Sequence, residues 1–102
     1  MTDLDKLIDA VEAGVDIFPS HFPHDFNGKQ WAIRAYHGSL DAAKALHDAL
    51  LPGWWFAIDG ALASVSDMND DDGPFFNATV KGNPARAWLL AILKAYKSKV
   101  HE

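Results

Sequence analysis

The period of the hydrophobic positions changes along the chain, and each period predicts a different element. Residues 4–11 carry apolar side chains at i, i+3, i+4 and i+7, which is the spacing of an amphipathic helix. Thr2 is a suitable N-cap for this helix, and Gly14 is a suitable end. In residues 17–28, two prolines and a closing Asn-Gly exclude a long regular element. The phenylalanines of this loop are expected to fold it back onto the core: Phe18, Phe22 and Phe26.

Helical spacing returns in three later segments. Residues 29–36 predict a short helix with three candidates for burial: Trp31, Ile33 and Tyr36. Ser39 is the expected N-cap of a further helix over residues 40–51. The last helix is expected to start at Pro84, with Asn83 as its N-cap, and to run to about residue 99. Its large apolar side chains share one face, and its alanines provide a flank for close packing.

Alternation with a period of two marks a β-hairpin between these helices. Residues 54–58 and 61–66 flank Asp59-Gly60, which predicts a two-residue type I′ turn. This register places six side chains on one face, in the pairs Ile58 with Ala61, Phe56 with Ala63 and Trp54 with Val65. The opposite face carries Trp55, Ala57, Leu62 and Ser64. Trp55 there either meets another layer or is displayed for binding.

Residues 75–80 predict a third strand, antiparallel to the second. Because all three strands come from one continuous segment, the sequence indicates an antiparallel meander rather than a parallel α/β sheet. We therefore predict a single α+β domain over residues 1–102, in which three to four helices cover the meander in a sandwich-like arrangement.

Composition narrows the function classes. The chain has 102 residues, of which 49% are hydrophobic, so it can bury a core as one globular domain. The absence of cysteine excludes disulfide frameworks, thiolate metal sites and cysteine nucleophiles. The formal net charge of −5 argues against general nucleic-acid binding. No apolar run approaches the roughly 20 residues of a membrane span and no signal peptide opens the chain, so we expect a cytoplasmic protein without a membrane partner.

The negative charge is unevenly distributed. Residues 1–51 hold eight acids and four bases, a sum of −4, whereas residues 52–102 hold six acids and five bases, a sum of −1. The acids concentrate in the first helix and in the segment from Asp67 to Asp72. Such a surface can mimic DNA or meet a basic partner, and its simpler interpretation is solubility.

The start of the last helix is a candidate ligand-binding site. Lys81 and Arg86 place two positive charges at a helix N-terminus, whose free N–H groups can hold phosphate or carboxylate. Trp55 or Phe75, if exposed nearby, can stack on a base. The alternative is plain capping by Asn83 with a solvated Arg86.

Other polar motifs are weaker. His21 and His24 are candidate ligand-binding residues, but without a third ligand nearby they indicate local hydrogen bonding more than a metal site. The segment that starts at Asp67 departs from a calcium loop, because its glycine falls one place late at Gly73. No catalytic triad or phosphate-binding glycine motif is evident. We therefore predict neither enzymatic activity nor a cofactor.

Two sequence runs carry a family resemblance. Ala35-Tyr-His-Gly-Ser-Leu-Asp-Ala-Ala-Lys-Ala-Leu-His47, a tryptophan-rich hairpin and Asn83-Pro-Ala-Arg-Ala-Trp-Leu-Leu-Ala-Ile-Leu93 follow in that order. They resemble small proteins of proteobacterial phages and prophages and are similar in layout to the phage ABA-sandwich domain. That domain has Thr-Pro-Ala-x-Ala at its final helix, where this chain has Asn83. The resemblance carries over no catalytic residue.

The resemblance implies a virus-encoded accessory protein in a bacterial host. Our first functional hypothesis is a non-catalytic anti-defence binder that sequesters a small phosphate-bearing nucleotide signal as a homo-oligomeric sponge. A second is an acidic protein–protein inhibitor of a host defence complex, similar to an anti-CRISPR protein or a DNA mimic. A third is a phage structural or assembly factor.

Overall fold

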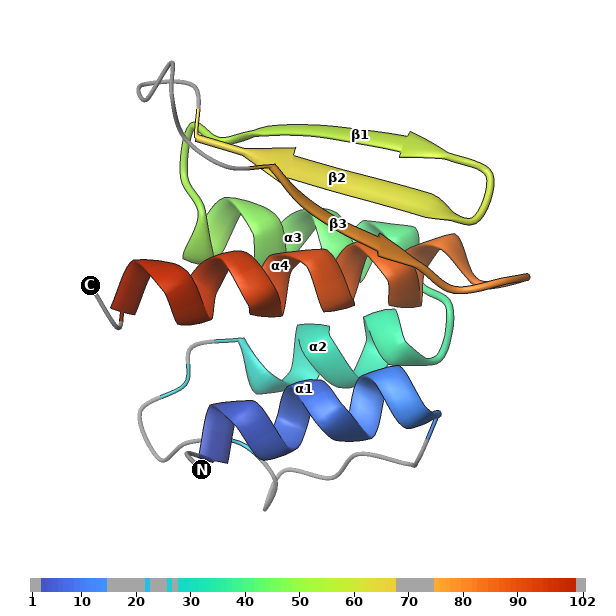
Figure 1. The fold of residues 1–102 in the computed structure, drawn as a ribbon, viewed down its shortest axis with the longest axis horizontal. Helices are drawn as coiled ribbons and strands as arrows, with labels where there is room; N and C mark the ends of the chain where they lie inside the picture. Colours follow the sequence, from blue (N-terminus) through green and yellow to red (C-terminus); the bar gives the residue numbers. More distant parts are fainter. Residues whose placement is uncertain (1–2, 15–21, 23–25, 27, 68–74, 101–102) are drawn as a thin grey trace.

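The computed structural model describes residues 3–14, 22, 26, 28–67 and 75–100 (Figure 1). Within these residues the chain forms four helices and a three-stranded antiparallel sheet with the strand order β1-β2-β3. The elements in chain order are α1 (Asp3–Ala13), α2 (Lys29–Tyr36), α3 (Leu40–Leu50), β1 (Trp55–Asp59), β2 (Leu62–Ser66), β3 (Phe76–Thr79) and α4 (Pro84–Val100). This confirms the predicted single α+β domain with a three-stranded meander.

The elements stack in three layers (Figure 1). The sheet forms one outer layer, α3 and α4 lie beneath it, and α1 and α2 form the layer on the far side. All described helices therefore lie on one face of the sheet. None of them combines the length and the apolar character needed to cross a membrane.

Helix α4 lies at the centre and contacts every other element layer. It packs against the sheet, α3, α2 and α1. Its predicted small-residue flank is fully buried, as are large side chains of the same helix: Ala85, Ala87, Ala91 and Ala95, with Leu89, Ile92 and Leu93. Apolar side chains occupy most of the helix surface, and such a helix is stable where neighbouring elements cover it, as the two adjacent layers do here. The Lys97 ammonium also pairs with Asp5 of α1.

The predicted strand faces are confirmed, but the predicted pairing is wrong by two residues. Asp59 pairs with Leu62, Ile58 with Ala63 and Phe56 with Val65, so the two-residue turn is Gly60-Ala61. A type I′ turn needs positive φ at both central residues, and here Gly60 alone has it, at 58°. The Val80 N–H donates to the Ala61 carbonyl at 3.0 Å, which holds the turn against the end of β3. A shift of two residues keeps every side chain on its face.

The helix ends agree with the sequence patterns. The Ser39 hydroxyl accepts a hydrogen bond from the Ala42 N–H at 3.1 Å, which confirms Ser39 as the N-cap of α3.

Phe22 and Phe26 are buried as expected, and the rings of Phe26 and Tyr96 meet edge to face at 5.7 Å. The roles expected of Thr2 and Phe18 fall outside the described residues.

The sequence predicts that Trp31 is buried, but the structure shows it exposed. Its side chain is 38% exposed, whereas Ile33 is half-buried and Tyr36 is buried. The inward stripe of α2 consists of Ala32, Ala35 and Tyr36, at i, i+3 and i+4. Trp31 precedes this stripe by one residue, so its ring lies at the edge of the helix contact.

Candidate functional site

The start of α4 is built around Asn83, whose side-chain amide joins two helices. Its Oδ1 accepts a hydrogen bond from the Arg86 N–H at 3.0 Å, which caps α4 as predicted. Its Nδ2 donates to the Tyr36 carbonyl at 3.2 Å, at the last residue of α2. One side chain therefore satisfies a free donor of α4 and a free acceptor of α2.

The Arg86 side chain packs between helices instead of extending into solvent. Its guanidinium carbon lies 4.9 Å from the centre of the Tyr36 ring. A Cβ on Gly14 would come within 3.0 Å of the Arg86 Nη2, so the guanidinium also touches the end of α1. This position suits a cation, because the C-terminal ends of α1 and α2 carry the negative ends of their helix dipoles. The Arg86 Nε is buried and has no hydrogen-bond partner among the described residues.

The structure does not bring the other predicted site residues to this helix start. Lys81 is exposed in the turn before α4. Trp55 and Phe75 lie at the opposite end of the sheet, where their rings meet edge to face at 5.9 Å. The four residues of β3, Phe76–Thr79, separate Phe75 from the turn before α4 and span roughly 13 Å. His21 and His24 fall outside the described residues, and no group of three metal-ligating side chains occurs within them.

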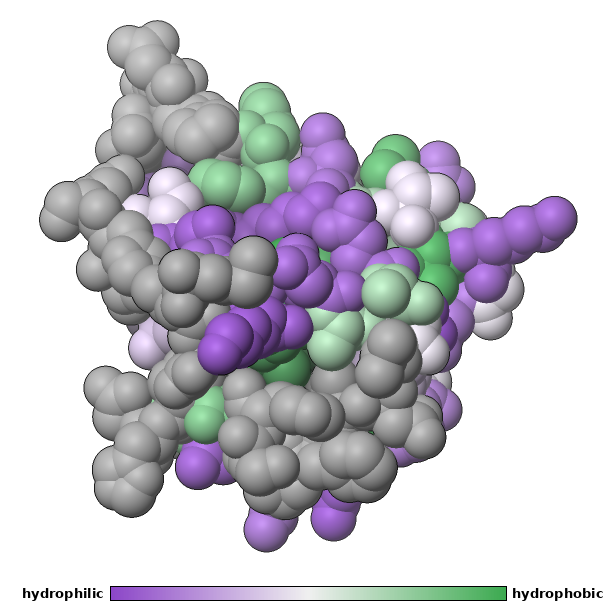
Figure 2. All heavy atoms as spheres, turned by 60° about the horizontal axis from the view of Figure 1, so that its bottom comes forward, coloured by the Kyte–Doolittle hydropathy of each residue, from purple (hydrophilic) through white to green (hydrophobic). Residues whose placement is uncertain are grey.

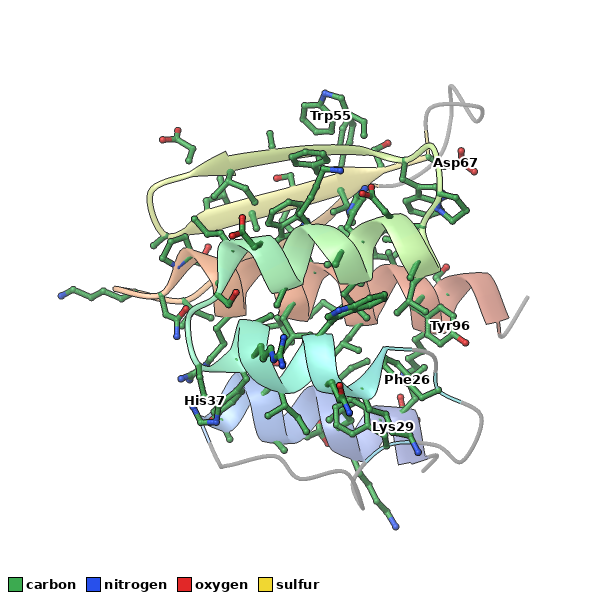
Figure 3. The ribbon with its side chains drawn as sticks, turned by 180° about the vertical axis from the view of Figure 1, so that it is seen from behind. Phe26, Lys29, His37, Trp55, Asp67 and Tyr96 are labelled. Carbon is green, nitrogen blue, oxygen red and sulfur yellow. The ribbon has the colours of Figure 1, made fainter. Side chains whose placement is uncertain are left out.

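The outer face of the sheet carries Trp55 into solvent. Figure 3 shows Trp55 on the side of the sheet away from the helices. Trp55 is 41% exposed, Leu62 42% and Phe75 63%. Of the two fates predicted for Trp55, display is the one observed within the described residues, because no described element covers this face.

The exposed side of α1 has a mixed charge. Lys6 is exposed together with Asp9 and Glu12, and Asp5 pairs with Lys97. In Figure 2, viewed from the side of α1, hydrophilic residues surround smaller hydrophobic areas. Helix α1 nevertheless holds four acids and one base, and residues 68–72 of the predicted acidic surface lie outside the described residues, so the acidic inhibitor face stays a prediction.

A buried histidine was missed as a site feature. His47 has 1% of its surface exposed, and its Nε2 donates to the Trp54 carbonyl at 3.0 Å. The Trp88 indole N–H lies 3.4 Å from Nδ1, which accepts from it. Both ring nitrogens are thus used by the neutral ring.

Burial lowers the pKa of His47 below its ordinary value, because a buried cation loses its hydration. The hydrogen bond to Trp54 and the charge of Asp48 act against this change in pKa, whereas Lys44 adds to it. His47 therefore has a structural role between α3, β1 and α4. Its place beside Leu46 on the apolar face of residues 40–51 was the available sequence signal.

Two hollows flank Trp31 on the surface of α2. One has a volume of about 320 Å³ and is lined by Trp31, Arg34, Ser39, Asp41, Ala42 and Ala45. The other has a volume of about 410 Å³ and is lined by Phe26, Gly28, Lys29, Gln30 and Trp31. These volumes lie at the lower end of the range for small-molecule sites. Figure 3 shows Lys29 at the start of α2, near Phe26.

Gly28 lies close to one edge of the Trp31 ring. It has a φ of 92°, and a Cβ there would come within 2.8 Å of the Leu46 side chain and 3.0 Å of the Trp31 ring. One edge of the ring therefore lies against Gly28, and 38% of the Trp31 surface is exposed.

Helix α2 is cationic within an acidic chain. Its sequence contains Lys29 and Arg34 and no acid. Neither base forms an ion pair within the described residues. Comparison with protein-family models, curated proteins and solved structures finds no match to this chain.

Proposed function

We propose that this protein is a non-catalytic binding protein for a small phosphate-bearing molecule with a planar base, held in the hollow between α2 and α3. The observation that carries the proposal is the combination of Trp31, which lies close to Gly28 and is 38% exposed, with Arg34 in the same hollow. An aromatic ring can stack on any nucleobase, and a guanidinium binds phosphate through two parallel hydrogen bonds.

Each wall of the hollow has a chemical role under this proposal. Trp31 stacks on the base, and Arg34, three residues later on the same helix, binds the phosphate. The N-terminus of α3 adds the positive end of a helix dipole. Asp41 also lines the hollow, so the phosphate binds on the Arg34 side while the carboxylate accepts a hydrogen bond from a ligand hydroxyl or amino group.

This site replaces the location predicted from the sequence while keeping the ligand class. At the start of α4 the Arg86 guanidinium already contacts Tyr36 and Gly14, and the exposed aromatic residues lie at the far end of the sheet. In the phage context that the resemblance implies, the proposed ligand is a nucleotide immune signal. The protein then acts as a sponge in the bacterial cytoplasm.

Calorimetry tests the proposal with a panel of adenosine monophosphate, ADP-ribose, cyclic dinucleotides and inorganic phosphate. We expect at least one nucleotide to bind and phosphate alone to bind far more weakly. Trp31→Leu and Arg34→Gln should each weaken nucleotide binding by about tenfold or more, because one stacked base is worth about 1–3 kcal/mol.

Lys6→Gln provides the matched control. It removes one exposed positive charge on α1, away from the hollow, and should leave nucleotide affinity unchanged. If no nucleotide releases or absorbs heat, the proposed function is wrong. If Lys81→Gln weakens binding while Arg34→Gln does not, the proposed location is wrong.

A further inference from the structure

The outer face of the sheet combines three exposed large apolar side chains with small and polar ones, and it is almost uncharged. The strand register places eight described residues on it, of which Ser66 is buried: Trp55, Ala57, Asp59, Leu62, Ser64, Ser66, Asn77 and Thr79. Phe75, which precedes β3, adds its ring beside Trp55 at this face. Only Asp59 among them carries a charge, in a chain whose formal net charge is −5. Three of the five large apolar side chains that are exposed in the described residues lie on this face. Exposed apolar groups that gather in this way mark interaction surfaces.

We propose that this face binds a second copy of the same chain, sheet against sheet, around a two-fold axis near the middle of β2. The proposal is independent of nucleotide binding, because the hollow is lined by residues 31–45 of α2, α3 and the link between them and by no residue of the sheet.

The outer face of the sheet is complementary in shape to a second copy of itself. At one end the rings of Trp55 and Phe75 form a raised ridge, and at the other end Leu62 protrudes. Small side chains lie between them, where the Ser64 hydroxyl donates to Asn77 Oδ1 at 2.6 Å. In an isologous pair, each patch meets its complement twice. The aromatic ridge of each copy then lies over the Leu62 end of the other, and the small residues pack at the axis.

The charge of this face disfavours nucleic acid and basic proteins as partners. Nucleic acid needs Lys or Arg, and none of the described residues on this face is a base. A basic protein needs acids, and only Asp59 is available here. Two acidic copies repel least where both surfaces are neutral, so the outer face of the sheet is the surface on which they can meet.

The size of the face indicates a weak dimer. Three strands of about five residues span roughly 15 by 17 Å, which is about 250 Å² in projection for each copy. Stable dimers bury about 800 Å² on each partner. We therefore expect association that depends on protein concentration, with monomers at low micromolar and dimers near millimolar concentration.

Sedimentation velocity over this concentration range tests the proposal. Trp55→Ser and Leu62→Ser should each raise the dissociation constant at least about tenfold, as loss of a central apolar contact does. Leu40→Ser is the matched control, because Leu40 on α3 is 46% exposed and Leu62 is 42% exposed. It should leave the dissociation constant unchanged. Circular dichroism establishes that each variant is folded.

The salt dependence of association provides a second measurement. Each copy carries a formal net charge of −5, so two copies repel one another as they associate. Added salt screens this repulsion, so the dissociation constant should fall as salt is raised. Binding of an acidic surface to a basic partner would have the opposite dependence.

A cross-link locates the interface. Packed sheets lie about 10 Å apart, beyond the reach of a disulfide, so a short bismaleimide is used on Ser64→Cys, in a chain with no native cysteine. We expect this variant to cross-link and Ala13→Cys, exposed at the end of α1, to stay monomeric. A wild-type chain that stays monomeric at millimolar concentration overturns the proposal. So does association that persists unchanged in Trp55→Ser and Leu62→Ser.

Discussion

The two faces of the sheet carry similar side chains in opposite environments. On the inner face, Phe56 stacks on Trp88 of α4 at 4.6 Å, and Val65 is fully buried. On the outer face, Trp55 and Leu62 are exposed on the same two strands. Alternation along a strand therefore determines which residues share a face, and the neighbouring layer determines which face becomes core. Large apolar side chains stabilise the fold on the inner face and are free for association on the outer one.

Replacing one tryptophan on each side of the sheet, Trp88 and Trp55, should give the largest difference in the free energy of unfolding. Trp88→Ala leaves a cavity next to Phe56 and removes the indole donor to His47, so the free energy of unfolding should fall by about 3–5 kcal/mol. Trp55→Ala should change it by less than about 0.5–1 kcal/mol. Urea denaturation at low micromolar concentration measures both values without a contribution from association. Equal losses would contradict the assignment of the two faces.

A pair of neighbours on β2 tests the same boundary with small changes. Ala63→Ser places a hydroxyl in the core at a fully buried position, which should cost about 1–3 kcal/mol. Ser64→Ala, one residue later, removes only the exposed hydrogen bond to Asn77 and should cost about 0.2–1 kcal/mol. Thermal unfolding followed by circular dichroism compares the two. A larger loss from Ser64→Ala would mean that the outer face is covered.

The sequence predicts these faces correctly and misses the pairing that creates them. The parity of Phe56, Ile58 and Val65 follows from alternation alone, which is a local property. The observed turn is joined to Val80, one residue past β3, whose N–H donates to the Ala61 carbonyl from 19 positions further along the chain. Such a long-range contact leaves no trace in the spacing around Asp59-Gly60, whose dipeptide by itself favours a type I′ turn.

The candidate site was predictable only in part, for a similar reason. The sequence identifies Asn83 as a helix cap because capping is local. Its hydrogen bond to Tyr36 joins two residues that are 47 positions apart in the chain. Arg86 was expected at an anion site, and only the tertiary structure brings Tyr36 and Gly14 against it. The exposure of Trp31 likewise depends on how α2 docks, because the inward stripe contains two alanines and a tyrosine beside it.

Asn83 should contribute less to the free energy of unfolding than Trp88, through its two hydrogen bonds between α2 and α4. Asn83→Ala removes the cap of α4 and the bond to α2 together, so we expect a loss of about 1–2 kcal/mol in urea denaturation. Asn83→Asp keeps the acceptor for the Arg86 N–H and removes the donor to Tyr36. The free energy of unfolding should therefore fall less in Asn83→Asp than in Asn83→Ala. If Asn83→Asp is as damaging as Asn83→Ala, the bond to Tyr36 and not the cap accounts for the stability.

Acid is the mildest perturbation of the inner face, because it adds one proton and removes no side chain. The folded chain favours neutral His47, so the pKa of His47 is lower in the folded state than its value of about 6.5 in the unfolded chain. Between these two pKa values the unfolded chain binds more protons, and the free energy of unfolding should therefore fall as the pH is lowered below 6.5. Above that pH the contribution of His47 is complete and constant.

His47→Gln isolates this contribution, because glutamine keeps an N–H donor for the Trp54 carbonyl and does not titrate. The fall in stability between pH 7.5 and pH 5.5 should be smaller in this variant than in the wild type by the contribution of His47, with carboxylates affecting both alike. A nuclear magnetic resonance titration of the His47 ring protons measures the folded pKa directly. Because Nδ1 accepts from Trp88 and Nε2 donates to Trp54, a second ring proton has no acceptor unless one of these contacts opens. Protonation should therefore shift the Trp88 indole resonance at the same pH, and the Trp55 indole resonance, on the exposed face, should stay unchanged.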